Sequence, residues 1–210
     1  MSLELPVRYE LEGWQLFAAD LGRGDDDVEG LATLRREVAA TVRQEFELAQ
    51  LAAHPTVAAM RRLFRAAGTD PTRYRPASEA LLRRLLKGDE LPAIHPFVDI
   101  NNCLSAGLAV PACVMAEGTF AGPYELRSGA PDESYESLRG PFKLEGRPLL
   151  LDAHGPCDSP ITGSQRVKVN NDTHRCTLVA YLPQDIVSLE DAQQTLNELV
   201  ARTSAVILVS

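Results

Sequence analysis

The spacing of apolar residues changes near Leu91, and this change constrains the fold more than any other feature of the chain. Before it, in residues 28–46, apolar side chains recur every three or four positions, which is the period of an amphipathic α-helix. These side chains are Val28, Leu31, Leu34, Val38, Val42 and Phe46. Two more helices are predicted to begin at Pro55 and Pro76, because proline suits the first helical turn, and to end at the glycines that follow.

Beyond Leu91 the apolar residues form short runs separated by glycine and proline, which is typical of strands. Strands are predicted over 97–100, 112–115, 124–126, 149–151, 167–169 and 177–182. A late helix is predicted to begin near Ser188, before a terminal strand over 205–209, and an opening strand is predicted within 7–19. The pattern predicts an α+β fold, with a helical front half and a β-rich back half.

The bulk composition fits a globular protein of one domain, with 210 residues, 45% hydrophobic and 24% charged. No apolar run is long enough to cross a membrane, and the first residues lack the basic and apolar regions of a signal peptide, so a cytoplasmic location and no membrane partner are expected. A net charge of −8 argues against wrapping DNA or other nucleic acid non-specifically. It leaves room for a local basic patch that binds an RNA end.

No motif for a nucleophilic serine, a phosphate-binding loop or a dinucleotide-binding loop is present. The four cysteines show no C-x-x-C spacing, so reduced thiols, no disulfide, no metal and no cofactor are expected. A less favoured alternative groups His154, Cys157, His174 and Cys176 as a metal cluster in a small-molecule enzyme.

Two consecutive asparagines, Asn101 and Asn102, directly follow the apolar run that is predicted to be a strand. Asparagine is a poor residue for a strand interior, but its side-chain amide offers two donors and an acceptor to a polar ligand. The alternative interpretation is a turn or a helix cap, where asparagine is also favoured.

Residues 70–84 and 91–102 together resemble the B3/B4 domain, the editing module of the bacterial phenylalanyl-tRNA synthetase beta subunit, which also occurs as free-standing proteins. Shorter segments continue the resemblance. They are Gly122 with Leu126-Arg127, Glu133-Ser-Tyr135, and Ser164-Gln-Arg-Val-Lys-Val169 followed by Thr173. The similarity covers roughly residues 54 to 209.

The resemblance implies a partly open Greek-key β-barrel joined to a helix-bearing mixed sheet, with the ligand pocket where the two parts meet. Residues 54–210 would form this B3/B4-like domain, and an N-terminal strand and long helix in residues 1–53 would pack on it. The implied activity is trans-editing, the hydrolysis of misacylated tRNA at its 3′ end. The tRNA ester is already activated, so positioning groups can suffice without a catalytic triad. The rival is a module of the same fold that binds an amino acid or an RNA end without hydrolysis.

The resemblance also implies roles for particular residues. Catalytic roles fall to Asn101, Asn102 and Glu133, although an ion pair or cap is slightly favoured for Glu133. Substrate-binding roles fall to Cys113, Gly163, Ser164, Gln165, Arg166 and Lys168, and tRNA-binding roles fall to Arg73, Arg75, Arg83 and Arg84.

The sequence departs from the synthetase pattern at two of these positions. Cys113 replaces a pocket histidine, and Gln165 lies near the place of a pocket glutamate, which weakens any transfer of specificity for tyrosine. Arg166 and Lys168 alternate with valines along the strand predicted over 167–169, which predicts one basic face for a phosphate or a carboxylate.

Overall fold

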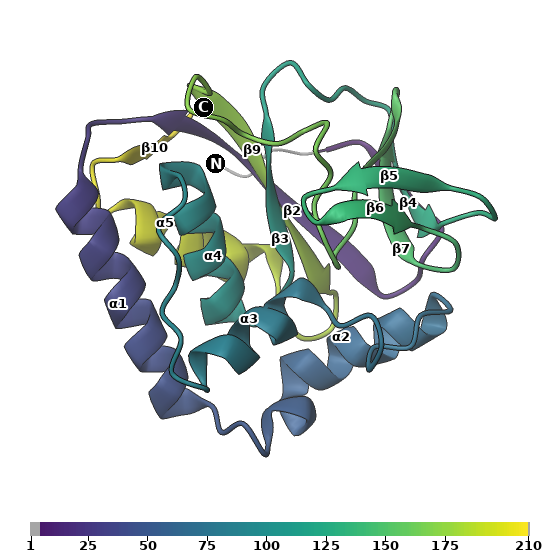
Figure 1. Ribbon diagram of the computed structural model, residues 1–210, viewed down its shortest axis with the longest axis horizontal. Helices are drawn as coiled ribbons and strands as arrows, with labels where there is room; N and C mark the ends of the chain where they lie inside the picture. Colours follow the sequence, from purple (N-terminus) through teal and green to yellow (C-terminus); the bar gives the residue numbers. More distant parts are fainter. Residues whose placement is uncertain (1–4, 210) are drawn as a thin grey trace.

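The computed structural model describes residues 5–209; residues 1–4, which belong to the predicted N-terminal part, and Ser210 lie outside the described residues. The α+β class is confirmed, with helices and strands in the following order (Figure 1). The elements are β1 (Val7–Tyr9), β2 (Trp14–Arg23), α1 (Val28–Glu45), a 3₁₀ turn (Leu51–Ala53), α2 (Pro55–Ala66), α3 (Ala77–Leu85), α4 (Pro96–Leu108), β3 (Ala112–Ala116), β4 (Tyr124–Ser128), β5 (Ser134–Ser137), β6 (Gly140–Lys143), β7 (Pro148–Asp152), β8 (Gly155–Asp158), β9 (Arg175–Pro183), α5 (Leu189–Val200) and β10 (Val206–Leu208).

The central sheet is antiparallel, with the strand order β10-β2-β9-β3. Strand β2 pairs with β9 from Trp14 opposite Pro183 to Gly22 opposite Arg175, so a strand of the N-terminal part lies in the middle of this sheet. The boundary predicted between residues 53 and 54 stays a prediction. Strand β3 lies at the edge of the sheet, next to the second half of the molecule.

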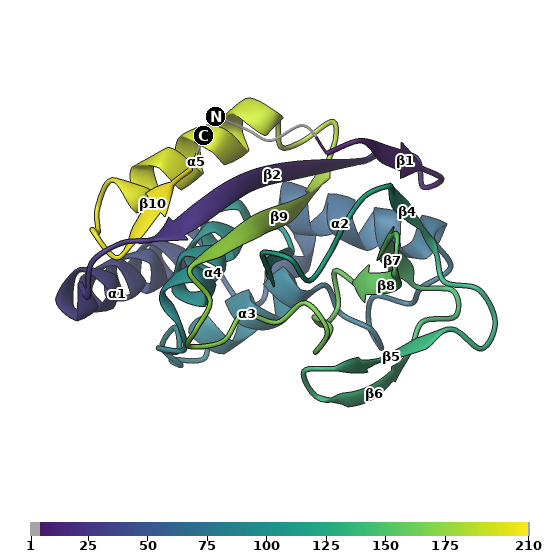
Figure 2. The same cartoon turned by 90° about the horizontal axis from the view of Figure 1, so that it is seen from above.

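The central sheet separates two hydrophobic cores, because successive side chains of a strand point to opposite faces. Phe17 and Ala19 of β2 pack in the core that α1, α4 and α5 cover, whereas Leu16 and Ala18 pack in the other core. This second core is closed by a sheet of order β1-β4-β7-β8 and by Met60 of α2 (Figures 1 and 2).

Strands β5 and β6 form a hairpin that stands apart from both larger sheets. Its tip is attached to the chain near residue 164: Ser137 bridges to Ser164, the Leu138 N–H donates to the Gly163 carbonyl over 3.0 Å, and the Gln165 N–H donates to the Glu136 carbonyl over 2.9 Å. These contacts place the hairpin opposite α4 across the edge strand β3 (Figure 1).

The segment predicted as a strand over 97–100 is part of helix α4, so that prediction is wrong. The His95 ring caps the helix, with Nδ1 accepting from the Phe97 N–H, and one Asp99 oxygen accepts from the backbone N–H of Ile94. Phe97 and Leu104 lie seven residues apart and are both fully buried, which fits two helical turns. A short apolar run does not distinguish a buried strand from a buried helix, and here the capping interactions at the first turn favour the helix.

The segment 167–169 is not a strand either. The Val167 carbonyl accepts from the Ala116 N–H over 2.8 Å, but the chain then turns at Asn170, whose N–H donates to the Thr173 hydroxyl. Val167 packs in the second core and Val169 in the first, so this segment crosses the edge of β3 from one core to the other. The predicted basic face of a strand is therefore absent here.

The other predicted elements are confirmed in outline. The late helix begins after Ser188, whose hydroxyl accepts from the Asp191 N–H while the Asp191 carboxylate accepts from the Ser188 N–H, which is a reciprocal capping box. The opening segment divides into β1 and β2, with a turn at Gly13, and β5, β6 and β8 lie where no strand was predicted. No helix within residues 5–209 is long and apolar enough to cross a membrane.

Candidate functional site

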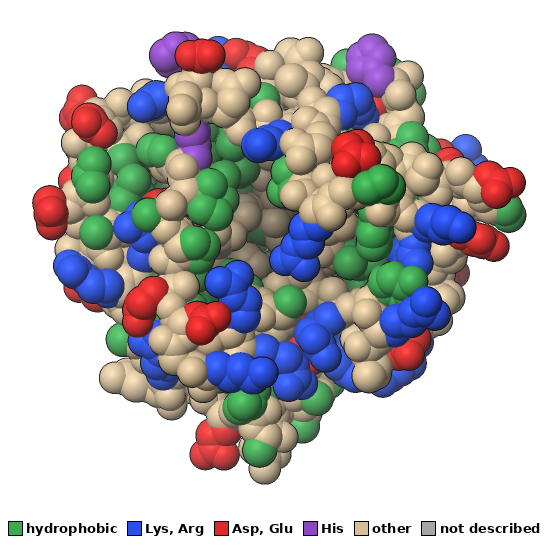
Figure 3. Space-filling model, in the orientation of Figure 1, with side chains coloured by type: hydrophobic (Ala, Val, Ile, Leu, Met, Phe, Trp, Pro, Cys, Tyr) green, Lys and Arg blue, Asp and Glu red, His purple; other side chains and the backbone are tan. Residues whose placement is uncertain are grey.

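The face shown in Figure 3 is hollowed at its centre, over the edge strand β3 and between α4 and the β5–β6 hairpin. The first three residues of β3, 112–114, are only half-buried, although the rest of the strand is buried. Lys and Arg side chains gather along one border of the hollow, over α3 and α2 (Figure 3). We refer to this depression over β3 as the central hollow.

Asn101 and Asn102 lie in the middle of α4, so neither of them is a cap. The Asn101 side chain is buried: its Nδ2 donates to the Ala112 carbonyl over 3.3 Å, whereas its Oδ1 has no hydrogen-bond partner among the described residues. Asn102 is half-buried, and its side chain makes no hydrogen bond to any residue within 5–209. Asn101 thus joins α4 to the beginning of β3, and Asn102 keeps a free amide.

Cys113 lies on β3 in a cluster of polar side chains, of which Asp158 and Tyr181 were not predicted from the sequence. The centre of the cluster is Asp158, at the end of β8, which is 1% exposed. Its Oδ2 accepts from the Tyr181 hydroxyl over 2.6 Å. Burial raises the pKa of the Asp158 carboxyl to about 7, and the hydrogen bond from Tyr181 opposes this rise.

Tyr135 of the hairpin completes this cluster, which we call the Asp158 cluster and define as Cys113, Tyr135, Asp158 and Tyr181. The Tyr135 hydroxyl donates to the Thr162 carbonyl over 2.5 Å. Burial, and then the nearby Asp158 carboxyl, raise the pKa of Tyr135 far above its ordinary value. The four residues come from β3, β5, β8 and β9, so the cluster joins both halves of the molecule.

The predicted turn 163–165 lies next to this cluster. Gly163 has no side chain, and a Cβ atom placed there would stand 3.6 Å from Oδ1 of Asp158 and 3.2 Å from the Leu138 side chain. Ser164 is buried and its hydroxyl accepts from the Arg166 N–H, whereas Gln165 is exposed. The structure therefore brings Cys113, Gly163 and Ser164 together at one end of the hairpin.

Arg166 has a structural role that the sequence did not reveal. Its guanidinium forms a two-pronged ion pair with Asp152, at 2.9 and 3.1 Å, and also donates to the carbonyls of Thr119, Gly155 and Pro156. These contacts occupy its donors and tie three segments together. Lys168 is exposed and makes no ion pair within the described residues.

Glu133 lies at the opposite end of β5 from Ser137, in an ion pair with Arg127. Its two carboxylate oxygens accept from the Arg127 guanidinium over 2.6 and 2.8 Å, and one also accepts from the Ala130 N–H. The hydrogen bond from Arg127 lowers the pKa of Glu133. The ion-pair interpretation describes its contacts, and none of them reaches the Asp158 cluster.

The predicted tRNA-binding arginines divide into two groups. Arg75 and Arg83 approach the buried carboxylate of Glu79, at 3.5 and 2.9 Å, where Arg61 also forms a two-pronged contact. Arg73 and Arg84 are exposed: Arg73 stacks over the Tyr74 ring, and Arg84 pairs with exposed Asp89. The first group neutralises a buried acid, and the second is available to solvent.

The alternative metal cluster does not form. Cys157 packs in the second core and Cys176 in the first, on opposite sides of the central sheet. Within residues 5–209, no group of three or more His, Cys, Asp or Glu side chains is placed to hold a metal ion, and the four cysteines are free thiols.

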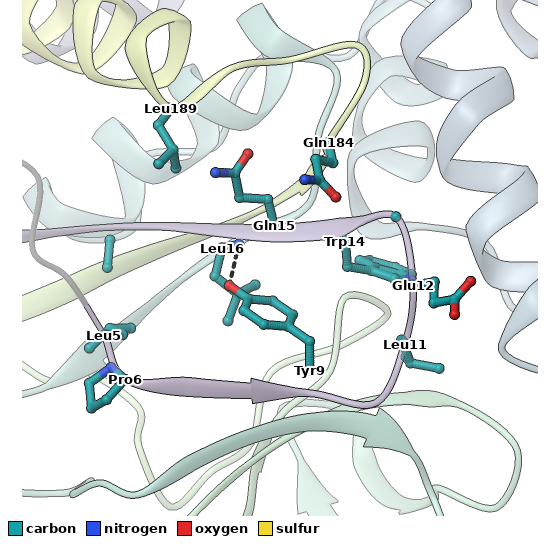
Figure 4. A pocket seen from close by; sticks show the side chains of 12 residues that line it. Leu5, Pro6, Tyr9, Leu11, Glu12, Trp14, Gln15, Leu16, Gln184 and Leu189 are labelled. Carbon is teal, nitrogen blue, oxygen red and sulfur yellow. Dashed lines mark hydrogen bonds between the residues drawn. The ribbon is translucent and has the colours of Figure 1, made fainter.

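A pocket of about 710 Å³ lies elsewhere, between β1, β2 and the start of α5 (Figure 4). Its lining includes Tyr9, Trp14 and Leu189, and the Tyr9 hydroxyl accepts from the Leu16 N–H over 3.0 Å. None of the predicted site residues lines this pocket, and Glu12 is the one ionisable carboxylate in its lining. The predicted site residues therefore lie outside this pocket.

Comparison with known proteins places the site in a family context. The family model described as the B3/4 domain matches residues 59–203, which include all the predicted site residues and the Asp158 cluster. The curated proteins gave no significant match. Among solved structures, an N-terminal fragment of the phenylalanyl-tRNA synthetase beta-subunit from Pyrococcus horikoshii is similar, with 13% identity and a TM-score of 0.48 over 96% of this chain. This chain covers 49% of that fragment.

Proposed function

This chain belongs to the B3/4 domain family, and on that premise we propose that it is a trans-editing deacylase, which hydrolyses the ester between a wrongly attached amino acid and the 3′ end of tRNA. The observation that carries the proposal is the central hollow, which lies over β3 between α4 and the hairpin and has a basic border (Figures 1 and 3). Asn102 and Cys113 belong to α4 and β3, the elements beside it. The resemblance of residues 70–84 and 91–102 to the editing module supplies the reaction.

The distribution of charge supports an RNA partner that is bound at one end. The chain is acidic overall, with a net charge of −8, so extended contact with the phosphate backbone is disfavoured. The basic side chains over α3 and α2 provide local positive charge next to the hollow. Exposed Arg73 and Arg84 would contact phosphates, and the amino acid would enter the hollow.

The main task of the site would be to position the substrate and a water molecule. An aminoacyl ester is an activated group, so the site must hold the amino acid, hold the terminal adenosine and place water near the carbonyl carbon. Asn102 has an amide that makes no hydrogen bond within residues 5–209, and buried Asn101 has an unpaired carbonyl oxygen; both belong to α4, beside the hollow. Gly163 lies beside Asp158, and its lack of a side chain avoids crowding Leu138.

The direct test measures turnover on a panel of tRNAs, each charged with a different amino acid. We expect release of free amino acid, above the spontaneous rate, from one member or a few. The variant Asn102→Ala should lose most of this turnover, and Asn197→Ala, on the exposed side of α5, is the matched control. No release from any member of the panel would contradict the proposal.

The alternative of a non-catalytic binding module has one observation in its favour. Of the residues assigned by resemblance, the carboxylate of Glu133 and the guanidinium of Arg166 are both occupied by ion pairs. A module that binds without hydrolysis would retain misacylated tRNA in a filter-binding assay and release no amino acid.

A further inference from the structure

One carboxylate oxygen of Asp158 makes no hydrogen bond of normal geometry to any residue within 5–209, although the Cys113 thiol and the Ser159 N–H lie close enough to lower the pKa of the carboxyl. Its Oδ2 accepts from the Tyr181 hydroxyl over 2.6 Å, but Oδ1 has no hydrogen-bond partner within residues 5–209. A buried acceptor without a partner costs about 1–3 kcal/mol. Native proteins have few such atoms, and a catalytic role or a bound water is among the explanations for each of them.

The residues that surround Oδ1 of Asp158 lie next to the central hollow. A Cβ atom placed on Gly163 would stand 3.6 Å from Oδ1 and only 3.2 Å from the Leu138 side chain, so the glycine lets the backbone pass close to the carboxyl without crowding. The thiol of Cys113 also lies against the carboxyl. Cys113, Tyr135 and Gly163 are each half-buried, so the carboxyl lies one layer of side chains below the accessible surface.

The two oxygens of Asp158 therefore have different environments. The Tyr181 hydroxyl fixes the orientation of the carboxyl through one oxygen, and the other oxygen lies next to the backbone of Gly163. A base that is held by a third group, with its free atom directed toward the reacting centre, is the usual arrangement in catalytic sites.

We propose that Asp158 is the general base of the hydrolysis and that Tyr181 is its positioning residue. This inference rests on the proposed deacylase function. The oxygen of a water molecule attacks the ester carbonyl carbon while one of its protons passes to Oδ1 of Asp158. The tetrahedral intermediate then breaks its bond to the ribose oxygen, and that oxygen takes the proton from Asp158. Free amino acid and the tRNA 3′ hydroxyl result, and the carboxylate is restored.

The protonation behaviour of the cluster agrees with this role. Burial raises the pKa of Asp158 to about 7, close to the value that suits a base at neutral pH. The titratable groups that face it are Tyr181 on β9, Cys113 on β3, Tyr135 on β5 and Cys157 on β8. Burial raises the pKa of each of these four, so all are neutral at pH values where Asp158 ionises.

Other carboxylates that face this half of the molecule fit the role poorly. Asp152 is held by the two-pronged ion pair with Arg166, and Glu133 is held by Arg127. A carboxylate whose oxygens already accept from a guanidinium is a weaker base, because protonation must break the pair. No cation within residues 5–209 pairs with Asp158.

The test is single-turnover deacylation by the full chain, with the panel tRNA that the wild-type protein deacylates fastest. We expect Asp158→Asn to lower the rate constant by about 10²–10⁴-fold, with little change in the tRNA concentration that gives half the maximal rate. The matched control is Asp132→Asn, in the exposed turn before β5, which should keep the wild-type rate.

The pH profile separates a base from a merely structural carboxyl. The wild-type rate should rise tenfold per pH unit and level off above about pH 7, and the profile of Asp158→Asn should be flat. Tyr181→Phe removes the largest of the hydrogen-bond effects that lower the Asp158 pKa, so the rising part of the pH profile should move to higher pH.

The inference would be overturned if Asp158→Asn deacylated at the wild-type rate. It would also be overturned if folded Tyr181→Phe had the same pH profile as the wild type. Neither result would contradict the deacylase function. Thermal melting shows whether Asp158→Asn is folded. If it is not, the pH profile of Tyr181→Phe alone tests the inference. A wild-type protein that releases amino acid from no panel member would instead overturn the deacylase function itself.

Discussion

The hydroxyl of Tyr181 on β9 donates to Oδ2 of Asp158 on β8 over 2.6 Å, and both side chains are buried. This hydrogen bond joins the central sheet to the second sheet. It also holds the orientation of the Asp158 carboxyl, whose other oxygen has no hydrogen-bond partner among residues 5–209.

The first prediction concerns the pH dependence of stability. Because burial raises the pKa of folded Asp158 to about 7 from an ordinary value of 3.8, the folded state holds a proton that the unfolded chain releases between those values. This contribution is complete below pH 3.8 and is lost as the pH rises through about 7. It amounts to roughly 4 kcal/mol of unfolding free energy.

Urea unfolding of the wild type and Asp158→Asn at a series of pH values measures this contribution. The wild type should lose stability relative to the variant as the pH rises, and the difference should become constant above about pH 7. A difference that does not change with pH would mean that Asp158 ionises as an ordinary exposed carboxyl does.

The second prediction concerns Asn102. Alanine has a higher helix propensity than asparagine by up to about 0.7 kcal/mol, and the Asn102 side chain makes no hydrogen bond within residues 5–209. Asn102→Ala should therefore keep or slightly raise the unfolding midpoint. Loss of one hydrogen bond to the substrate should slow deacylation by roughly 10–100-fold. Unchanged turnover in this variant would remove Asn102 from the site.

The third prediction separates Arg166 from Lys168. Arg166→Ala leaves the fully buried Asp152 carboxylate without its cation and should cost about 3–5 kcal/mol of unfolding free energy. Lys168→Ala is an exposed change and should stay within about 0.5 kcal/mol. If Arg166→Ala instead kept its stability and lost turnover, the substrate-binding role that the resemblance implied would be correct.

The fourth prediction separates the two groups of arginines. Arg61→Ala weakens the compensation of buried Glu79 and should lower the unfolding free energy by about 1–3 kcal/mol. Arg73→Ala and Arg84→Ala should keep the stability and weaken tRNA binding. Each lost phosphate contact should reduce the slope of log affinity against log salt by about 0.7–0.9. A salt slope that both exposed variants leave unchanged would place the RNA on another surface.

The sequence predicted the features that depend on nearby residues. The apolar period of residues 28–46 identified α1, and Ser188 with its acidic first turn located the start of α5, because helical periodicity and capping act within a few residues. The change in the spacing of apolar residues near Leu91 predicted the α+β class. The resemblance of residues 70–84 and 91–102 identified the family.

Local pattern failed where two structures share one signal. The apolar run 97–100 suits a strand and a buried helix equally, and the helix is decided by His95 and Asp99, which cap its first turn. At 167–169 the alternation of valines is real, but it reflects burial in two different cores rather than one face of a strand.

The Asp158 cluster became visible only in the tertiary structure. Asp158 and Tyr181 are 23 residues apart, Tyr135 comes from the hairpin and Cys113 from the edge strand, and no local pattern marks any of them as polar partners. A carboxyl with an unpaired oxygen and a raised pKa is defined by what surrounds it, and that surrounding forms only when β3, β5, β8 and β9 meet. The sequence by itself determined helices α1, α2, α3 and α5, the fold class and the family, because these follow from local periodicity and motif spacing. The chemistry of the hollow follows from long-range packing, which determines burial, hydrogen bonding and protonation.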